Sequence, residues 1–79
     1  MFTSAQLRSA RATLKWSLEE LSQRSGVGTT TLKRFESADG VPNGNLSTFN
    51  TLRKIFEEAG IEFIGTPEDG PGVRYYPKK

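Results

Sequence analysis

The sequence contains no cysteine and no histidine among its 79 residues. Thiol nucleophiles, imidazole bases, disulfides and the usual zinc sites need one of these residues, so their absence excludes each of them. Carboxylates alone could still hold a metal ion. The acidic pairs are, however, typical of solvated helix or turn surfaces: Glu19-Glu20, Glu57-Glu58 and Glu68-Asp69. We therefore expect no enzyme activity, no catalytic residues, no metal and no cofactor.

Long apolar runs are also missing. No stretch approaches the roughly 20 apolar residues of a membrane span, and the opening "MFTSAQLRSARATL" is broken by polar residues throughout. Hydrophobic residues make up 34% of the chain, which gives a small core without room for a deep substrate cavity. These features predict a single small cytoplasmic protein that does not enter the membrane.

Charge is present but unevenly distributed, although the net value is only +2. Residues 1–54 carry eight Lys and Arg against four acids, whereas residues 55–79 carry three against five. The first part therefore has a net charge of +4 and the second of −2. This asymmetry is compatible with a face in the N-terminal part that binds a polyanion.

Two short helices are predicted after a first helix that is capped by Thr3 or Ser4 and ends near Lys15-Trp16. Ser17 can cap the second helix, with Glu20 completing a capping box, and Gly26 ends it after about two turns. A third helix is expected to start near Gly28-Thr29 and to run to about Ser37. Helices of two turns are unstable alone, so both must pack against other elements.

The second half of the chain has a different pattern of predicted elements: a loop, one longer helix and two strands. The loop "ADGVPNGN", residues 38–45, precedes a predicted helix over Leu46–Ala59 that Gly60 stops. The runs "IEFI" and "VRYY" predict two strands, and the intervening "GTPEDGPG" predicts a hairpin loop longer than a tight turn.

The segment "LRSARATLKWSLEELSQRSGVGTTTLKRFE", residues 7–36, contains two short helices joined at Gly26-Val27, which is the pattern of a helix-turn-helix. In apolar spacing, in the small Ser22 and in the closing Glu36, it resembles the Cro/repressor-type helix-turn-helix family, also called the xenobiotic-response-element family. The resemblance implies a mainly α, lambda-repressor-like four-helix DNA-binding domain over residues 1–60. A C-terminal β-hairpin extension and tail, residues 61–79, would pack on the same domain.

Helical geometry alone sorts the faces of the third helix. Leu32 and Phe35 define its inner face, and the side chains expected to point outward are those of Thr30, Lys33, Arg34 and Ser37. Thr29 lies at the positive end of the helix dipole, where a phosphate is favoured. Exposed Lys and Arg often serve only solubility, but a helix-turn-helix with these side chains suits the major groove of DNA.

Further candidate residues are indicated by the family resemblance and by the loop over residues 38–45. The family often has Gln where this chain has Leu18, and Ser or Thr as the helix cap where it has Gly28. Asn43 and Asn45 could donate to phosphate, although asparagine in such a loop often serves turn geometry. The resemblance implies an ion pair between Arg11 and Glu36. The full predicted DNA-binding set is Gly28, Thr29, Thr30, Lys33, Arg34, Ser37, Asn43 and Asn45.

Two functions remain open at this stage. The first is a sequence-specific regulator of double-stranded DNA, a repressor or autorepressor that acts by occupying its operator. The second is a helical protein-interaction adaptor or antitoxin-type module with weak or no DNA binding, which Leu18 and the modest charge favour. We also expect a homodimer on an inverted-repeat operator, and a protein partner or concentration as its control. The hairpin would pack on the fourth helix, or pair across the two-fold axis as well.

Overall fold

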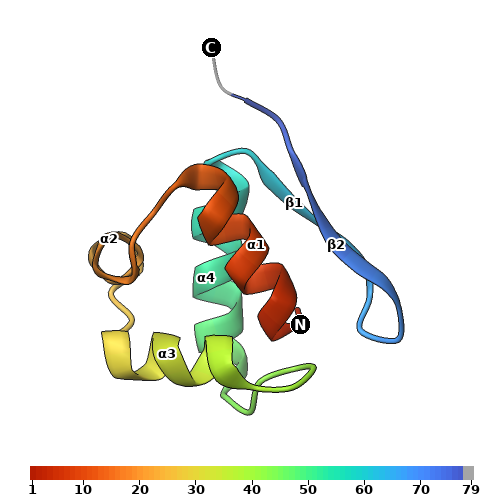
Figure 1. Ribbon diagram of the computed structural model, residues 1–79. Helices are drawn as coiled ribbons and strands as arrows, with labels where there is room; N and C mark the ends of the chain where they lie inside the picture. The colour runs from red at the N-terminus through yellow and green to blue at the C-terminus, as the bar shows by residue number, and fades with distance from the viewer. Residues whose placement is uncertain (78–79) are drawn as a thin grey trace.

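The computed structural model describes residues 1–77, which form four helices followed by one antiparallel hairpin (Figure 1). This confirms the predicted fold class. The elements are α1 (Ser4–Leu14), α2 (Leu18–Ser25), α3 (Thr29–Ser37), α4 (Leu46–Glu58), β1 (Ile61–Thr66) and β2 (Asp69–Tyr75). No helix of the described part is long and apolar enough to cross a membrane. Lys78 and Lys79, the end of the predicted 61–79 segment, lie outside the described residues.

α1 begins at a complete capping box. The Thr3 hydroxyl accepts a hydrogen bond from the backbone N–H of Gln6, and the Gln6 side chain accepts one from the backbone N–H of Thr3. Thr3 is therefore the cap, rather than the alternative Ser4. Lys15, in the left-handed conformation at φ 58°, ends the helix.

α2 begins and ends where the sequence predicts, at Ser17 and Gly26, but one detail of the prediction is wrong. The Ser17 hydroxyl accepts from the Glu20 N–H at 3.0 Å, as expected. The Glu20 carboxylate does not complete a capping box; it accepts instead from Nε of Arg24 at 2.8 Å, one turn further along the helix. An ion pair between residues four apart in a helix competes with the capping box for the same carboxylate. In α2 the Glu20 carboxylate forms the ion pair.

Asn45 caps the start of α4: its side-chain oxygen accepts from the Thr48 N–H at 2.9 Å. The helix ends at Glu58, one residue before the predicted Ala59, and Gly60 follows with φ 99°. A difference of one residue at a helix end is within the usual variation between criteria.

The hairpin differs from the prediction, because there is no long loop. β1 extends to Thr66 and β2 begins at Asp69, so only two residues, Pro67 and Glu68, join the strands. The register shifts between Ile64 and Thr66, where Gly65 of β1 lies opposite two residues of β2, Gly70 and Pro71, which is a β-bulge in β2; Gly65 itself has φ 75°. A Cβ there would also collide with the carbonyl oxygen of Gly70, so the position requires glycine on both counts.

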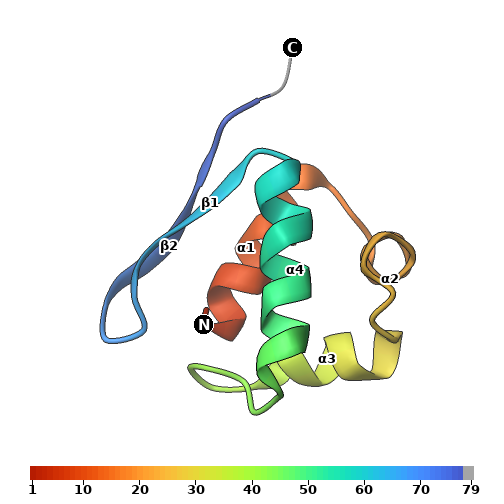
Figure 2. The same ribbon diagram turned by 180° about the vertical axis from the view of Figure 1, so that it is seen from behind.

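The core is drawn from all four helices and β1. Its buried side chains are Phe2, Leu7, Ala10, Leu21, Leu32, Phe35, Phe49, Leu52, Phe56 and Ile61. Phe63 joins the hairpin to this core: its ring stacks on Phe2 with centroids 5.0 Å apart and meets Phe56 edge-on at 6.0 Å. In both views the hairpin and α2 lie on opposite sides of the α1 and α4 pair (Figures 1 and 2).

Gln6 provides a polar link between α1 and the hairpin. Its side chain is 4% exposed, and besides accepting from Thr3 it donates from Nε2 to the carbonyls of Ile64 at 3.0 Å and Gly72 at 2.8 Å. Both carbonyls lie next to the bulge, where the ladder between the strands is interrupted. The first turn of α1 therefore supplies donors that the bulged hairpin needs.

Candidate nucleic-acid interface

α3 presents two distinct faces, because its apolar side chains recur at helical spacing. Leu32 and Phe35 are fully buried in the core. The side chains of Thr30, Lys33, Arg34 and Ser37 are exposed, so they form one outer surface with two cationic groups. The structure thus turns outward the four residues of α3 that the periodicity predicts to face away.

The N-terminal end of α3 leaves its backbone groups accessible. Gly28 is the cap residue and is exposed, and no side chain makes a cap hydrogen bond there. Thr29 follows, half-buried, as the first residue of the helix. Free N–H groups and the positive end of the helix dipole favour an anionic oxygen at such a position.

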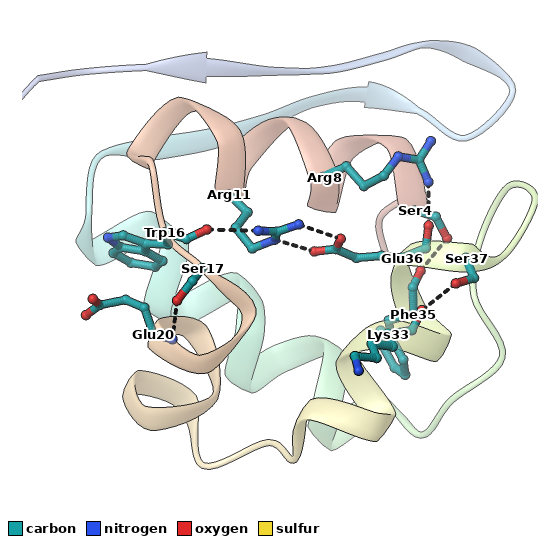
Figure 3. Close-up of polar contacts among 10 residues, drawn as sticks. All are labelled: Ser4, Arg8, Arg11, Trp16, Ser17, Glu20, Lys33, Phe35, Glu36 and Ser37. Atoms are coloured by element: carbon teal, nitrogen blue, oxygen red, sulfur yellow. Dashed lines mark hydrogen bonds and ion pairs between the residues drawn. The ribbon is translucent and has the colours of Figure 1, made fainter.

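A bidentate ion pair fixes α3 to α1. Arg11 donates from Nε to one carboxylate oxygen of Glu36 at 2.7 Å and from Nη2 to the other at 2.9 Å (Figure 3). Nη1 of Arg11 also donates to the carbonyl of Trp16 at 2.9 Å. The side chains of Arg11 and Glu36 are only 26% and 11% exposed. One guanidinium therefore joins α1, the connection to α2 and the end of α3.

The hydrogen bond to Glu36 raises the pKa of Arg11 above its ordinary, already high value, and the attraction of nearby carboxylates adds to this effect. Arg11 is consequently charged at every pH at which the protein would be used. Because two donors meet two acceptors in one plane, the pair also restricts the rotation of α3 relative to α1.

Two more side chains of α1 hold the last turn of α3. The Ser4 hydroxyl donates to the Phe35 carbonyl and Nη1 of Arg8 donates to the Glu36 carbonyl, both at 2.5 Å (Figure 3). Carbonyls at a helix C-terminus have no partner within the helix, so these contacts satisfy them. Sequence reasoning missed Ser4 and Arg8 in these roles, because the residues they contact are about thirty positions away in the chain.

The loop after α3 brings together two of the predicted DNA-binding residues. Nη1 of Arg34 donates to the backbone carbonyl of Asn43 at 2.6 Å, so the guanidinium is directed toward this loop. Asn43 contributes a carbonyl here. Asn45 uses its side-chain oxygen to cap α4 and accepts there also from the hydroxyls of Ser47 and Thr48.

The charges of the described residues separate into two groups. Arg11, Arg24, Arg53 and Arg74 each contact a carboxylate. Within residues 1–77, no carboxylate lies within ion-pair distance of the remaining cations, which are Arg8, Lys15, Lys33, Arg34 and Lys54. Three of the unneutralised cations lie on α3 or contact its C-terminal turn, which gives this surface an excess of positive charge.

Carboxylates do not gather into a metal site in the described part of the chain. No group of three or more Asp or Glu side chains in residues 1–77 is placed to hold an ion. The hydroxyls and cations of the α3 surface can donate to phosphate oxygens and to the edges of bases.

A family model described as "Helix-turn-helix" matches residues 7–47, just over half of the chain. The match runs from α1 through α3 to the start of α4. No curated protein matches the sequence. The chain thus belongs to the helix-turn-helix family of the Cro and repressor type, which is a family of DNA-binding transcriptional regulators.

Proposed function

We propose that this DNA-binding regulator of the helix-turn-helix family is a cytoplasmic repressor or autorepressor that acts by occupying its operator. α3 enters the major groove, the side chains of Thr30, Lys33 and Arg34 contact bases or phosphates, and the N-terminus of α3 at Gly28 and Thr29 receives a phosphate. At the other end of the helix, Ser37, Asn43 and Asn45 contact phosphates of the DNA backbone. RNA polymerase cannot bind a promoter whose operator is occupied in this way.

The observation that carries this proposal is the exposed cationic surface of a rigidly held α3. Lys33 and Arg34 face outward without a carboxylate partner in residues 1–77, while the Arg11–Glu36 pair fixes the helix behind them. A cation that is paired with a carboxylate would have to give up that partner before it binds a phosphate, and Lys33 and Arg34 have no such partner to lose in residues 1–77. Preorganisation lowers the entropy lost when the helix meets a groove.

A homodimer on an inverted repeat is the second part of the proposal. A single module of this kind buries only about 600–1,000 Å² on DNA, which is little for tight specific binding. Two copies related by a two-fold axis would read half-sites with centres roughly 34–36 Å apart.

The β1–β2 hairpin is the proposed main part of the dimer interface. It is a sheet of two strands in the described part of the chain, so each strand has one edge without a strand partner there. Tyr75 and Tyr76 at its end are large side chains that are 41% and 54% exposed. Strand edges and exposed aromatic rings are both suited to a self-complementary contact.

The DNA-binding part is tested by selection. Incubating the protein with a pool of random duplexes and sequencing the retained fraction should recover an inverted repeat, and footprinting should protect both half-sites on one face of the duplex. Transcription from a promoter that carries this site should fall when the protein is added. Recovery of no preferred sequence, or a rise in transcription, would contradict the proposed repressor.

The dimer part is tested by light scattering on the full chain over a range of concentrations, together with amide hydrogen exchange. Protection of strand amides that increases with concentration would support a hairpin interface. A monomer that binds DNA as one copy would end the dimer proposal, and protection confined to the helices would move the interface elsewhere.

An adaptor or antitoxin-type module is the alternative. Leu18, the first residue of α2, packs against the core and offers DNA no hydrogen bond, which favours this reading. The selection experiment separates the two functions, because an adaptor would retain duplexes weakly and without sequence preference.

A further inference from the structure

We propose that Arg8 of α1 is a phosphate-binding residue that contacts the DNA backbone beside the C-terminal turn of α3. The inference rests on the proposed placement of α3 in a major groove. It adds to that interface a residue which lies outside α2 and α3 and which the sequence pattern did not indicate.

Arg8 is held in place by one nitrogen while its other donors are free to bind. Nη1 donates to the Glu36 carbonyl at 2.5 Å, and the side chain is exposed. A guanidinium has five N–H donors in a planar fork, so a single bond to a carbonyl leaves most of them available. Figure 3 shows the guanidinium extending from α1 toward the end of α3, on the side of Ser4 and Glu36.

Comparison of the six arginines supports a role for the charge. Four of them contact carboxylates: Arg11, Arg24, Arg53 and Arg74. Arg8 and Arg34 contact no carboxylate in residues 1–77, and each is bound instead to a backbone carbonyl at or just after the end of α3. A positioned cation without a counter-charge is what recognition of an external anion requires.

The location also fits the geometry of a duplex. A helix in the major groove lies between two phosphate backbones, and contacts to these backbones fix its register. Glu36 and Ser37 form the end of α3, and the free part of the Arg8 guanidinium lies next to them. Arg8 can therefore reach a backbone that borders the groove, while Lys33 and Thr30 face the groove itself.

A competing explanation is that Arg8 only caps α3, since cations near a helix C-terminus satisfy carbonyls and interact favourably with the dipole. A cap needs a donor, whereas a phosphate contact needs the charge. Arg8→Gln tests both roles through separate readouts. It removes the charge, which the salt dependence of binding reports, and its side chain is two atoms shorter, so the loss of the contact with the Glu36 carbonyl is reported by the melting temperature. Arg53→Gln is the matched control: it also removes one arginine charge, but on α4, where Glu57 lies within ion-pair distance at 3.8 Å.

The experiment measures the affinity of the full chain for a fluorescently labelled duplex of mixed sequence as a function of salt. The plot of log affinity against log salt for Arg8→Gln should be shallower than wild type by about 0.9. This corresponds to about a five-fold loss of affinity at 0.15 M salt, which shrinks toward zero as the salt approaches 1 M. Arg53→Gln should retain the wild-type slope and affinity.

Three results would overturn the proposal. An unchanged slope for Arg8→Gln with a lower melting temperature would identify Arg8 as a cap only. Equal changes in Arg8→Gln and Arg53→Gln would show a general effect of net charge, and wild-type behaviour of both variants would show no role for either. The failure of the underlying function has a different signature, since the wild-type protein would then show no salt-dependent binding to any duplex.

Discussion

α3 and the β1–β2 hairpin are both small elements that depend on the rest of the fold, and they differ in how their charges are arranged. On the hairpin, Arg74 lies opposite Glu62 and donates to its carboxylate at 3.3 Å, while the Tyr76 hydroxyl donates to the same carboxylate at 3.0 Å. On and beside α3, Lys33, Arg34 and Arg8 have no carboxylate partner among residues 1–77. The neutralised surface suits a protein contact and the cationic one suits an anion.

The two elements are also attached to the same turn of α1 by different means. Ser4 and Arg8 bind the carbonyls at the end of α3, whereas Gln6 binds a carbonyl on each strand. Thr3, Ser4 and Gln6 are the buried polar residues of the described chain, and each has a hydrogen-bond partner. A single helical turn therefore positions both the proposed DNA surface and the proposed interface between copies.

The largest effect is expected from breaking the attachment of α3. Glu36→Ala should lower the free energy of unfolding by about 2–3 kcal/mol, because it leaves the mostly buried Arg11 guanidinium without its two carboxylate acceptors. Urea denaturation measures this loss. Glu20→Ala, which breaks an exposed pair on α2, should cost no more than about 0.5 kcal/mol. Equal losses in the two variants would show that the Arg11–Glu36 pair is no more important than a surface pair.

The next effect concerns the outer surface of α3. Lys33→Ala and Arg34→Ala should leave the melting temperature unchanged, since both side chains are exposed, and each should weaken operator binding by about 1–3 kcal/mol if it contacts a base. Fluorescence anisotropy on the selected operator measures this change. Unchanged affinity in both single variants would remove α3 from the interface.

A smaller effect is expected at the attachment of the hairpin. Gln6→Leu should destabilise the protein by about 1–2 kcal/mol, because the carbonyls of Ile64 and Gly72 and the N–H of Thr3 lose their partner. Amide exchange of the strands should accelerate in this variant. Gln6→Glu, which keeps an acceptor for Thr3 but loses the two donors, should accelerate strand exchange too while preserving the start of α1. Undisturbed strand exchange in both variants would contradict the link.

The smallest effect is expected on the outer face of the hairpin. Arg74→Ala should change the free energy of unfolding by no more than about 0.5 kcal/mol, because the Glu62 pair is exposed to solvent. DNA affinity, compared at a protein concentration where light scattering gives the variant and the wild type the same oligomeric state, should remain at the wild-type value. A loss of affinity as large as that of Lys33→Ala at the same oligomeric state would contradict the assignment of the two surfaces to different partners.

The helices could be predicted from the sequence because their signals are local. Ser17 lies next to the helix that it caps and Gly26 directly follows that helix, and the spacing of Leu32 and Phe35 sets the outward face of α3. The capping box of α1 also has a local signal, because Thr3 is followed three residues later by Gln6.

The hairpin and part of the site could not be predicted in this way. The segment "GTPEDGPG" forms a tight hairpin because β2 bulges opposite Gly65 and because Gln6, far away in the chain, supplies donors beside the bulge. The contact of Arg8 with Glu36 likewise depends on how α1 packs on α3. Sequence spacing within one element contains no information about such contacts between elements.

The most direct test of the central claim is a nuclear magnetic resonance titration of the full chain with its selected operator duplex, in which the backbone amide shifts of both regions are followed together. We predict that the largest shifts occur in α3, from Thr29 to Ser37, with a further shift at Arg8. The amides near the hairpin turn, at Glu68 and Asp69, should move little. Large shifts confined to the hairpin, with α3 unmoved, would contradict the claim that α3 is the surface that binds DNA.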